Sequence, residues 1–529
     1  MNKYWSRKVF IVVSLIFILL ASAWTHYWPP ARWSFLLVAG FIFQGIRDSL
    51  QKKHALLKNY PVLAHLRYFL ESIRTEVRQY FIESDSDEYP FSREMRSLVY
   101  QRAKGDLDTL AFGTRLDVNK VGYEWISHSL NPTHPKEEVS RVWIGKEQCQ
   151  QPYHASLFNI SAMSFGSLSN RAILALNQGA KIGNFYHNTG EGGLSPYHLK
   201  PGGDICWQIG TGYFGCRDEK GNFDEKLFQE KSTLPQVKLI EVKLSQGAKP
   251  SHGGILPAAK LTPEIAAIRN VPLGQDVLSP PAHTAFNSPR GLLEFLAKLR
   301  ELSGGKPVGF KLCVGSKSEF FSICKAMLET KLYPDFITID GAEGGTGAAP
   351  LEFSNNVGMP LNDGLSFVHN ALIACGLRDR IKLNVAGKIV TGFHVITKLA
   401  LGADLVDAAR AMMFALGCIQ ALKCNTNKCP TGVATQDLVL VSGLDPEDKS
   451  HRVAGFQKRT VDSVLHLLGA AGLNSPDEVQ PYHVYRRTAP SEIKQLIEIY
   501  PPAEPNCLVD GRIPERWARG WKEASVDKF

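Results

Sequence analysis

Phe-Ile-Thr-Ile-Asp-Gly-Ala-Glu-Gly-Gly-Thr-Gly, residues 336–347, is the segment that indicates the fold class most clearly. Its first five residues form a largely apolar run of strand length that ends on Asp340, and a glycine-rich turn follows at once. Short apolar runs bounded by turn residues are typical of strands that are buried on both faces, as in parallel sheets. A helical pattern comes after the turn, so this stretch predicts one strand–turn–helix unit.

The same unit recurs from about residue 140 onward. Eight units over about 330 residues predict an α/β fold, a (β/α)8 TIM barrel with insertions. The alternative is an open, doubly wound sheet with a dinucleotide loop. Residues 210–215 do read Gly-x-Gly-x-x-Gly, but a polar, turn-like stretch follows where the loop would need a helix, so we interpret the match as chance. The predicted strands are Leu157–Met163, Phe185–Asn188, Val237–Lys243, Val277–Ser279, Val308–Cys313, Phe336–Asp340, Ile381–Ala386 and Asp404–Ala408.

The composition is that of a globular protein, with 44% apolar and 21% charged residues in 529. Of the net charge of +9, seven units lie in residues 1–60, where eight basic side chains accompany one acid, Asp48. A nucleic-acid-binding protein would carry its basic excess on the folded body. We therefore expect no nucleic-acid partner, and the placement of the charge points to a membrane surface.

Two apolar runs, residues 9–28 and 33–46, flank Pro29-Pro30. Basic residues outside both runs predict a transmembrane hairpin in the inner or cell membrane, with the catalytic domain in the cytoplasm. The second run makes about 21 Å of helix, whereas the hydrocarbon core of a membrane is about 30 Å thick. The helix must therefore extend into flanking residues, or it enters the membrane without crossing it. The alternative is a secretory signal cleaved after Ala21-Ser22-Ala23. Seven of the ten cysteines are scattered singly along the chain, which is not a disulfide framework and agrees with a cytoplasmic body.

The domain layout follows from these patterns. Residues 1–50 are expected to form the anchor, 51–140 a polar helical region, and 141–475 the barrel. Residues 476–529 are rich in proline and aromatic residues and are expected to wrap around the body, with one helix over Ser491–Tyr500.

A cysteine-rich loop follows the last predicted strand. It reads Cys418-x5-Cys424-x4-Cys429-Pro430. Three thiolates in one loop, the last followed by proline, suit an iron–sulfur cluster. A structural zinc site instead needs a fourth ligand and a closer cysteine spacing of the C-x2-4-C type. With three thiolates and no fourth nearby, a three-iron cluster is indicated. The alternative is three buried thiols in a well-packed loop.

Glycine-rich turns and two lysines stand at the ends of predicted strands. Glycine lets the backbone approach a flat or anionic ligand closely. Gly387-Lys388 and Arg410 occupy the usual phosphate position of a barrel. Lys243 and Lys311 can lie inside a barrel only beside an anionic partner, such as a reduced flavin or a carboxylate substrate. The alternative is that both point outward between helices.

The motif Ser161–Ser169 resembles the opening strand of the synthase domain of glutamate synthase, and five further motifs continue the resemblance over roughly residues 155–440. The resemblance implies an FMN-binding barrel with a [3Fe-4S] cluster. It places Glu191, Lys243, Gln246 and Lys249 around the flavin and the 2-oxoglutarate pocket, as the catalytic set. It implies cofactor contacts from Met163, Ser164, Lys311, Gly344, Gly345, Thr346, Gly387, Lys388 and Arg410, and cluster ligation by Cys418, Cys424 and Cys429. The further motifs are Asn188–Gly193, Gln246–Pro250, Ser279–Pro281, Gly344–Pro350 and the loop Gly417–Gln436.

The chain also departs from that family. No cysteine precedes Cys149, whereas complete glutamate synthases begin with a cysteine amidotransferase, so we expect no glutaminase activity. Ser251-His252 replaces Gly-Glu after the Lys-Pro of its motif. Ala282 and Thr284-Ala285 interrupt a His-rich loop, and Asn384–Lys388 replaces a more acidic phosphate turn. The cofactors are therefore implied more directly than the substrate.

We expect hydride transfer between the flavin and a 2-imino or 2-amino acid, with the cluster passing electrons to or from a ferredoxin, a reductase or a quinone. One alternative is a membrane-linked dehydrogenase of amino acids or amines. Another is a non-catalytic, flavin-loaded redox subunit, against which the retained Glu191, Lys243 and Lys311 argue.

Overall fold

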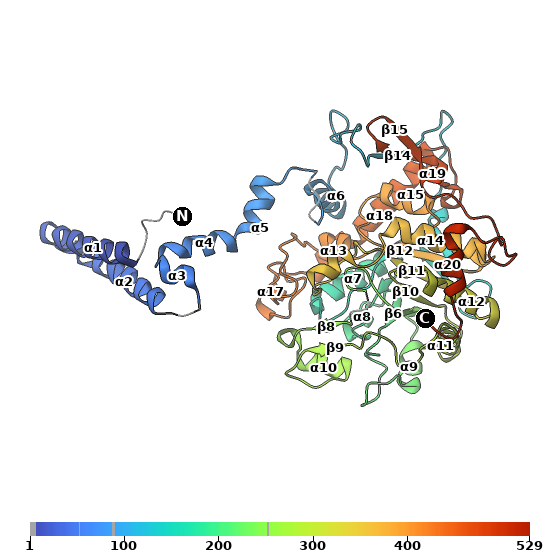
Figure 1. Ribbon diagram of the computed structural model, residues 1–529, viewed down its shortest axis with the longest axis horizontal. Helices are drawn as coiled ribbons and strands as arrows, with labels where there is room; N and C mark the ends of the chain where they lie inside the picture. The colour runs from blue at the N-terminus through green and yellow to red at the C-terminus, as the bar shows by residue number, and fades with distance from the viewer. Residues whose placement is uncertain (1–6, 52, 87–89, 251–252) are drawn as a thin grey trace. The chain divides into compact units, whose positions relative to one another are not determined.

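The computed structural model describes residues 7–51, 53–86, 90–250 and 253–529. The chain divides into two compact units, Met1–Ser84 and Asp85–Phe529, and each is treated by itself. Figure 1 shows the elements of both units.

The first unit is helical. Helices α1 (Arg7–Tyr27) and α2 (Ser34–Leu50) are joined by the 3-10 turn Pro29–Trp33 and lie against each other, with the Phe41 ring 5.5 Å from Phe10 and 5.1 Å from Phe17. At the end of α2, the buried carboxylate of Asp48 accepts hydrogen bonds from Gln44 and from the backbone N–H of Val62, both at 2.9 Å. Short helices follow: α3 (Ala55–Asn59), α4 (Leu63–Ser72), α5 (Arg74–Val77) and a π-helical turn, Arg78–Ile82.

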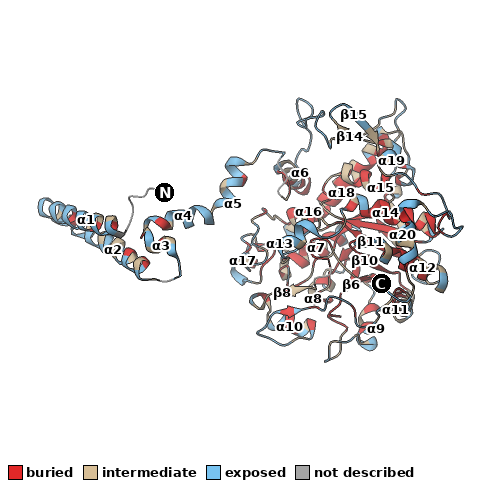
Figure 2. Cartoon of the chain, in the orientation of Figure 1, coloured by how far each residue is buried: buried red, intermediate tan, exposed pale blue. Residues whose placement is uncertain are grey.

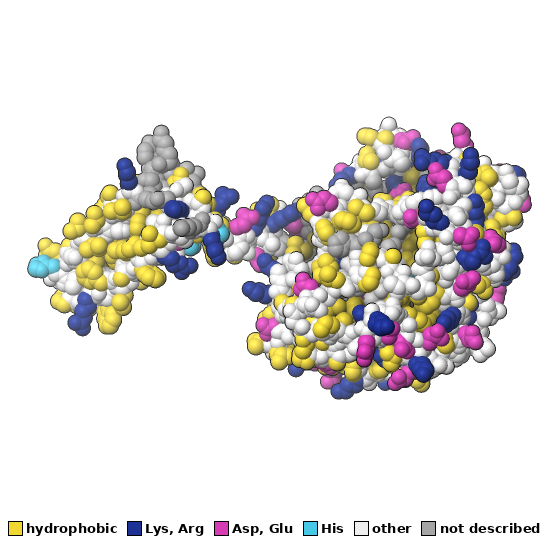
Figure 3. Space-filling model, turned by 60° about the horizontal axis from the view of Figure 1, so that its bottom comes forward, with side chains coloured by type: hydrophobic (Ala, Val, Ile, Leu, Met, Phe, Trp, Pro, Cys, Tyr) yellow, Lys and Arg dark blue, Asp and Glu magenta, His cyan; other side chains and the backbone are white. Residues whose placement is uncertain are grey.

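One helix of the described chain is long and apolar enough to cross a membrane. It is α1, whose residues Lys8–Tyr27 have a mean hydropathy of 2.2 and are 17% buried. A signal sequence or the core helix of a soluble protein meets the same criterion, so this is weak evidence for an anchor. Helix α2 has 17 residues and rises about 26 Å, still short of a hydrocarbon core of about 30 Å. Exposed apolar side chains cover both helices (Figures 2 and 3).

The second unit is built on a closed barrel of eight parallel strands, which confirms the predicted fold class. The buried strands lie at its centre and helices surround them (Figure 2). In barrel order the strands are β4 (Phe158–Ile160), β5 (His187–Asn188), β6 (Ile205–Ile209), β7 (Val237–Lys243), β10 (Val308–Leu312), β11 (Phe336–Asp340), β12 (Lys382–Ala386) and β13 (Leu405–Ala408).

One predicted barrel strand was wrong and one was missed. Residues 277–279 do not join the barrel, because β9 (Val277–Leu278) pairs antiparallel with β8 (Ile255–Leu256) in a separate two-stranded sheet. The missed strand is β6, which stands directly before the Gly-x-Gly-x-x-Gly stretch. Its Gln208 looks polar in the sequence, yet it is 1% exposed because its amide pairs with Glu241 inside the barrel.

Helices cover the barrel on the outside. Their bounds are α7 (Asn170–Gly183), α8 (Pro196–Leu199), α9 (Glu225–Ser232), α10 (Pro263–Arg269), α11 (Pro289–Leu302), α12 (Lys317–Thr330), α13 (Leu351–Asn356), α14 (Leu361–Ala374), α15 (Gly392–Ala400), α16 (Arg410–Ala415), α17 (Leu438–Ser442) and α18 (Pro446–Ala470). The long helix α18 packs against both α7 and α6 (Arg93–Lys104). A small hairpin, β2 (Arg141–Ile144) with β3 (Tyr153–Ser156), precedes the first barrel strand.

The regions flanking the barrel differ in part from expectation. The residues between α6 and the barrel are mostly irregular and contain β1 (Glu124–Ile126), so the helical prediction for 51–140 holds only for its first part. Strand β1 pairs with β14 (Val484–Ala489), which pairs with β15 (Glu492–Gln495). The helix expected over residues 491–500 is therefore half strand, followed by α19 (Leu496–Ile499). On α20 (Glu515–Glu523), Trp517 packs edge-on against Phe321 of the barrel helix α12.

Candidate active site

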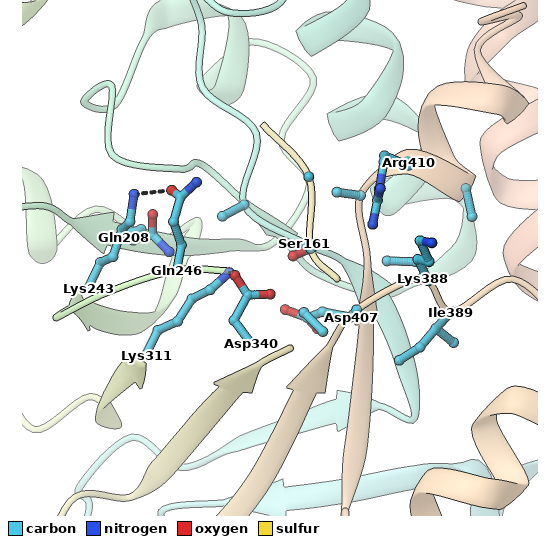
Figure 4. A pocket seen from close by; sticks show the side chains of 18 of the residues that line it. Ser161, Gln208, Lys243, Gln246, Lys311, Asp340, Lys388, Ile389, Asp407 and Arg410 are labelled. Atoms are coloured by element: carbon cyan, nitrogen blue, oxygen red, sulfur yellow. Dashed lines mark hydrogen bonds and ion pairs between the residues drawn. The ribbon is translucent and has the colours of Figure 1, made fainter. Parts of the chain in front are cut away.

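A pocket opens at the carboxyl ends of the barrel strands, where the loops of a closed parallel barrel converge. It encloses about 590 Å³, part of it open to solvent. Figure 4 shows Lys243, Gln246 and Gln208 on one side and Lys388 and Arg410 on the other. The lining residues are Phe91, Ser161, Ala162, Gln208, Lys243, Gln246, Lys311, Asp340, Gly344, Gly345, Ala386, Gly387, Lys388, Ile389, Asp407, Ala408, Ala409, Arg410 and Ala411.

Arg410 stands at one end of this pocket, at the first position of α16. Its Nη2 donates to the carbonyl of Glu343 at 2.7 Å, and its guanidinium lies 4.7 Å from the ring centre of Phe91. Burial lowers the pKa of Arg410 to about 10, and the group remains a cation at neutral pH. A Cβ added at Gly345 would come within 2.9 Å of the Arg410 side chain, so only glycine leaves room for it. Gly387 and Lys388 lie at the same end and complete a cationic, backbone-lined recess.

Lys243 and Gln246 stand at the opposite end, and both also line a second hollow of about 300 Å³. The ammonium of Lys243 lies 2.8 Å from a Glu191 oxygen and donates to the side-chain carbonyl of Gln246. The two hollows therefore meet at this pair of side chains. The second hollow is lined by Glu191, Thr211, Lys243, Leu244, Ser245, Gln246, Lys249, Gly253, Gly254, Pro280 and Pro281.

Cations outnumber anions around the second hollow. Burial by itself would raise the pKa of Glu191, but Lys243, Lys249 and Arg269 together hold that pKa below its ordinary value. Burial lowers the pKa of Lys249, and Glu191 opposes that effect. This hollow consequently offers buried positive charge and one carboxylate, which suits a ligand with carboxylate groups.

Lys311 lines the pocket from inside the barrel. It is 3.4 Å from Asp340, whose other contact is the backbone N–H of Gly247 at 2.9 Å. Burial would lower the pKa of Lys311, but Asp340, Glu241 and Asp407 raise it above the ordinary value. In strand register Lys311 is opposite Lys243, so both lysines point into the barrel and not outward between helices.

A chain of hydrogen bonds crosses the barrel interior from Glu241 to Asp407. The Glu241 carboxylate accepts from Gln208 and Thr338, both at 2.6 Å, and from Asn188 at 2.9 Å. The Asn384 amide reaches both the Thr338 hydroxyl and the Tyr186 hydroxyl at 3.2 Å.

Asp407 ends that chain and faces the pocket. Tyr186 donates to its Oδ1 at 2.6 Å, while Oδ2 is buried with no hydrogen-bond partner in the described chain. Burial raises the pKa of Asp407 to about 7, and the nearby Glu241 adds to that increase. A buried, unpaired carboxyl oxygen on a pocket wall is a group that a ligand can satisfy.

The remaining predicted site residues lie near the pocket without lining it. Met163 and Ser164 form the wall next to Gly190, and Ser161 and Ala162 line the pocket in their place. Thr346 is exposed, although the two glycines before it line the pocket. Ser251 and His252, which depart from the family pattern, fall outside the described residues.

The three loop cysteines lie beside the barrel within electrostatic reach of one another. Burial raises the pKa of Cys418 to about 12 and also raises that of Cys424. Burial would raise the pKa of Cys429 too, but the Thr431 side chain and backbone N–H groups of residues 431, 433 and 434 lower it. Among the described residues, no three His, Cys, Asp or Glu side chains are spaced to hold one metal ion.

A family model, the conserved region in glutamate synthase, matches residues 123–474. The chain belongs to this glutamate synthase family. The glutamate synthase large subunit-like protein YerD of Bacillus subtilis is 40% identical over 483 residues, covering 84% of this chain and 91% of YerD. The archaeal glutamate synthase (NADPH) of Methanocaldococcus jannaschii is 37% identical over 323 residues, covering 61% of this chain and 60% of that protein.

Solved structures show a weaker likeness to this member of the glutamate synthase family. Flavocytochrome b2 with sulfite bound is 14% identical with a TM-score of 0.44, covering 90% of this chain and 96% of that chain. Mandelate oxidase with benzoyl-formic acid is 14% identical with a TM-score of 0.41, covering 81% and 98%. At these values the likeness carries no argument about the site.

Sequence reasoning missed several lining residues of this glutamate synthase-like site. Asp340 and Asp407 each stand near the end of a correctly predicted strand, and that position was a signal that could have found them. Gln208 was missed because its strand, β6, was not predicted. Arg269, which acts on Glu191 without lining either hollow, could not be predicted, because its approach depends on how α10 folds over the barrel. Phe91 could not be predicted either, because it precedes the barrel by more than sixty residues.

The shifted pKa of Asp407 predicts a pH-dependent stability difference. Because its folded pKa of about 7 exceeds the unfolded value near 3.9, the folded state loses stability as pH rises from about 4 to 7. Asp407→Asn removes that loss but can still accept from Tyr186. In urea unfolding of flavin-free protein, we expect the variant to gain about 2–3 kcal/mol relative to wild type between pH 5 and pH 8.

The matched control is Asp335→Asn, a second buried aspartate. Asp335 is buried and pairs with the half-buried Arg300 at 2.9 Å, so its replacement removes the carboxylate partner of that guanidinium and should destabilise the fold at pH 8. If the stability of Asp407→Asn relative to wild type were equal at both pH values, the raised pKa of Asp407 would be contradicted.

Proposed function

We propose that this chain is an FMN-dependent oxidoreductase that transfers hydride between the flavin and a 2-imino or 2-amino acid. The observation that carries the proposal is that two hollows meet at Lys243 and Gln246. One is the elongated pocket that runs from these residues to Arg410, and the other is the second hollow, which is lined by cations. Membership in the glutamate synthase family supports it, and so does the name of the archaeal relative. The chain spans about 60% of that relative's length, so the relative's whole activity is proposed here and not carried over as established.

The elongated pocket fits FMN at three places. Arg410, Lys388 and the glycines beside them supply positive charge and backbone N–H groups at the end where one phosphate would bind. Lys311 supplies buried charge along the floor, and the unpaired Oδ2 of Asp407 supplies a polar group on the wall. A bound FMN would contribute the hydride chemistry, while these residues bind and orient it.

The second hollow fits a dicarboxylic 2-oxo acid or the matching amino acid. Lys249 and Lys243 line this hollow and provide buried cations for carboxylate groups, while Arg269 adds positive charge near Glu191. Glu191 is the only acid lining this hollow among the described residues, and it touches Lys243. We assign to this ion pair the movement of the proton that accompanies hydride transfer, because the two groups stand at the meeting point of both hollows.

We propose ammonia, or an amine from another protein, as the nitrogen source. Amide hydrolysis needs an activated thiol or hydroxyl beside a base. Within the described chain, the cysteines outside the loop whose pKa is shifted all have it raised, with burial the largest cause, which is the opposite of an activated nucleophile. They are Cys149, Cys206, Cys216, Cys313, Cys324 and Cys507.

The activity is tested with purified protein that has been reduced anaerobically and given 2-oxoglutarate. We expect label to pass into glutamate from labelled ammonium and not from the amide of labelled glutamine. Glu191→Gln should keep its flavin but lose about 100-fold in kcat/KM, because the proton-transferring group is gone. The surface variant Glu225→Gln, which alters only an exposed pair with Lys298, should react like wild type.

Other outcomes separate the alternatives. Glutamate or amines that bleach the flavin with no reverse reaction favour a dehydrogenase of amino acids or amines. A flavin that no 2-oxo acid, amino acid or electron donor, NADPH included, can turn over favours a non-catalytic redox subunit.

We also propose that Cys418, Cys424 and Cys429 hold a [3Fe-4S] cluster that passes electrons between the flavin and an external partner. A three-iron cluster binds each thiolate to a different iron, so the sulfurs need not converge as they do around a single ion. The donor set supports an anionic group: backbone N–H groups converge on Cys429, and the buried ammonium of Lys260 lies near Cys424 and Cys429.

Replacing each of these cysteines in turn by serine should abolish iron and sulfide binding, whereas Cys375→Ser, elsewhere in the barrel, should leave both unchanged. Paramagnetic resonance of the oxidised protein should show a three-iron signal. Stoichiometric zinc in this loop would rule out the electron-transfer role.

We further propose that α1 and α2 attach the chain to the inner or cell membrane, with the barrel in the cytoplasm. Ile16→Arg, near the centre of α1, should cost about 3 kcal/mol of membrane insertion and shift the protein toward the soluble fraction. The matched variant Tyr27→Arg, at the helix end, should stay in the membrane fraction. Cleavage after Ala23 that releases a soluble body would contradict the attachment.

A further inference from the structure

The segment before the barrel reaches both proposed cofactor sites. Phe91 immediately precedes Ser92, whose side chain accepts from the N–H of Met95 and starts α6. Phe91 is 2% exposed, and its ring lines the elongated pocket. This segment lies upstream of residue 123, where the match to the family model begins.

The backbone of Phe91 is held by a single side chain of the cysteine loop. Gln420 accepts the N–H of Phe91 at 3.2 Å, and its amide nitrogen donates to the Phe91 carbonyl at 3.3 Å. Gln420 is 4% exposed and lies between Cys418 and Cys424, with a φ of +58°. Its own N–H lies 3.4 Å from the Cys418 sulfur. The two-point contact thus fixes Phe91 to the loop in both position and orientation.

The side chain of Phe91 acts on the other site. Its ring faces the guanidinium of Arg410 at 4.7 Å, and Phe414 meets it edge-on at 5.3 Å. An aromatic face attracts a desolvated guanidinium, so the ring of Phe91 helps to decide where Arg410 points. Tyr100 of α6 adds a second tie to the loop, because its hydroxyl donates to the carbonyl of Cys418 at 2.6 Å.

We propose that Phe91 and Gln420 are positioning residues that couple the phosphate-binding end of the flavin pocket to the cysteine loop. The inference rests on the proposed FMN and cluster sites. When the loop is ordered by its cluster, Gln420 holds Phe91, and Phe91 holds Arg410 in the geometry that receives a phosphate. Because coupling between two binding sites is reciprocal, FMN bound at Arg410 also favours the ordered loop.

The coupling is measured as the dissociation constant of FMN, followed by flavin fluorescence, on protein with and without the cluster. Cys424→Ser provides the cluster-free form. We expect FMN to bind about 10-fold more weakly to it than to wild type, within the usual range of such coupling. Riboflavin, which lacks the phosphate, should change by less than about 3-fold, because Arg410 does not contact it.

Gln420→Ala should remove the coupling, so that combining it with Cys424→Ser weakens FMN binding by less than about 2-fold beyond Gln420→Ala alone. Phe91→Leu keeps apolar bulk and both backbone hydrogen bonds but loses the ring face. It should weaken FMN about 10-fold and riboflavin little. The iron content of Phe91→Leu should match that of wild type, while its three-iron resonance changes line shape.

The matched control is Gln457→Ala. Gln457 is equally buried, at 5% exposed, and donates both to Ser156 and to the carbonyl of Phe158, away from the loop. This variant tests for a general loss of packing, and it should leave the dissociation constants of FMN and riboflavin unchanged. Equal weakening of FMN and riboflavin in Phe91→Leu, or an undiminished effect of the cluster in Gln420→Ala, would overturn the coupling. Wild-type protein that takes up neither FMN nor iron would instead overturn the proposed function, and the coupling with it.

Discussion

One buried lysine balances the carboxylates inside the barrel, and the rest of the site depends on that balance. Lys311 lies among Asp340, Glu241 and Asp407, all nearly without solvent exposure. A buried charge is tolerated only when it is paired and hydrogen-bonded. Asp340 provides the pair at 3.4 Å, three donors satisfy Glu241, and burial raises the pKa of Asp407 to about 7. The floor of the pocket is consequently rigid and polar where a flavin would rest.

The closed barrel makes two adjoining hollows from this floor. Parallel strands end at one rim, so Lys243 of β7 and Lys311 of β10 stand side by side although 68 residues separate them. Lys243 turns toward Glu191 and joins the elongated pocket to the cation-lined hollow. A cofactor and a substrate placed in these hollows would meet at that side chain. This arrangement explains why the positive charges of the site are divided between its two ends.

The segment around α6 adds a third component. It packs on α16, the short helix that begins with Arg410 and leads into the cysteine loop. Phe91 and Tyr100 therefore reach the phosphate end and the loop from one short stretch of chain. The cysteine loop and the cationic end of the pocket therefore share a common support.

The barrel, seven of its eight strands, the cysteine loop and most of the charged residues of the site could be predicted from the sequence. These features are local: apolar runs ending in glycine turns, and cysteine spacing within one loop. The sequence-based prediction misplaced one strand, because Val277–Leu278 looks like a core strand and Gln208 makes β6 look polar. The contacts across the barrel, such as Asp407 with Tyr186 or Arg269 near Glu191, could be seen only in the three-dimensional structure. The tertiary structure also brings Phe91, far upstream in the sequence, into the pocket. Such contacts arise from chain closure and packing, so no local sequence pattern predicts them.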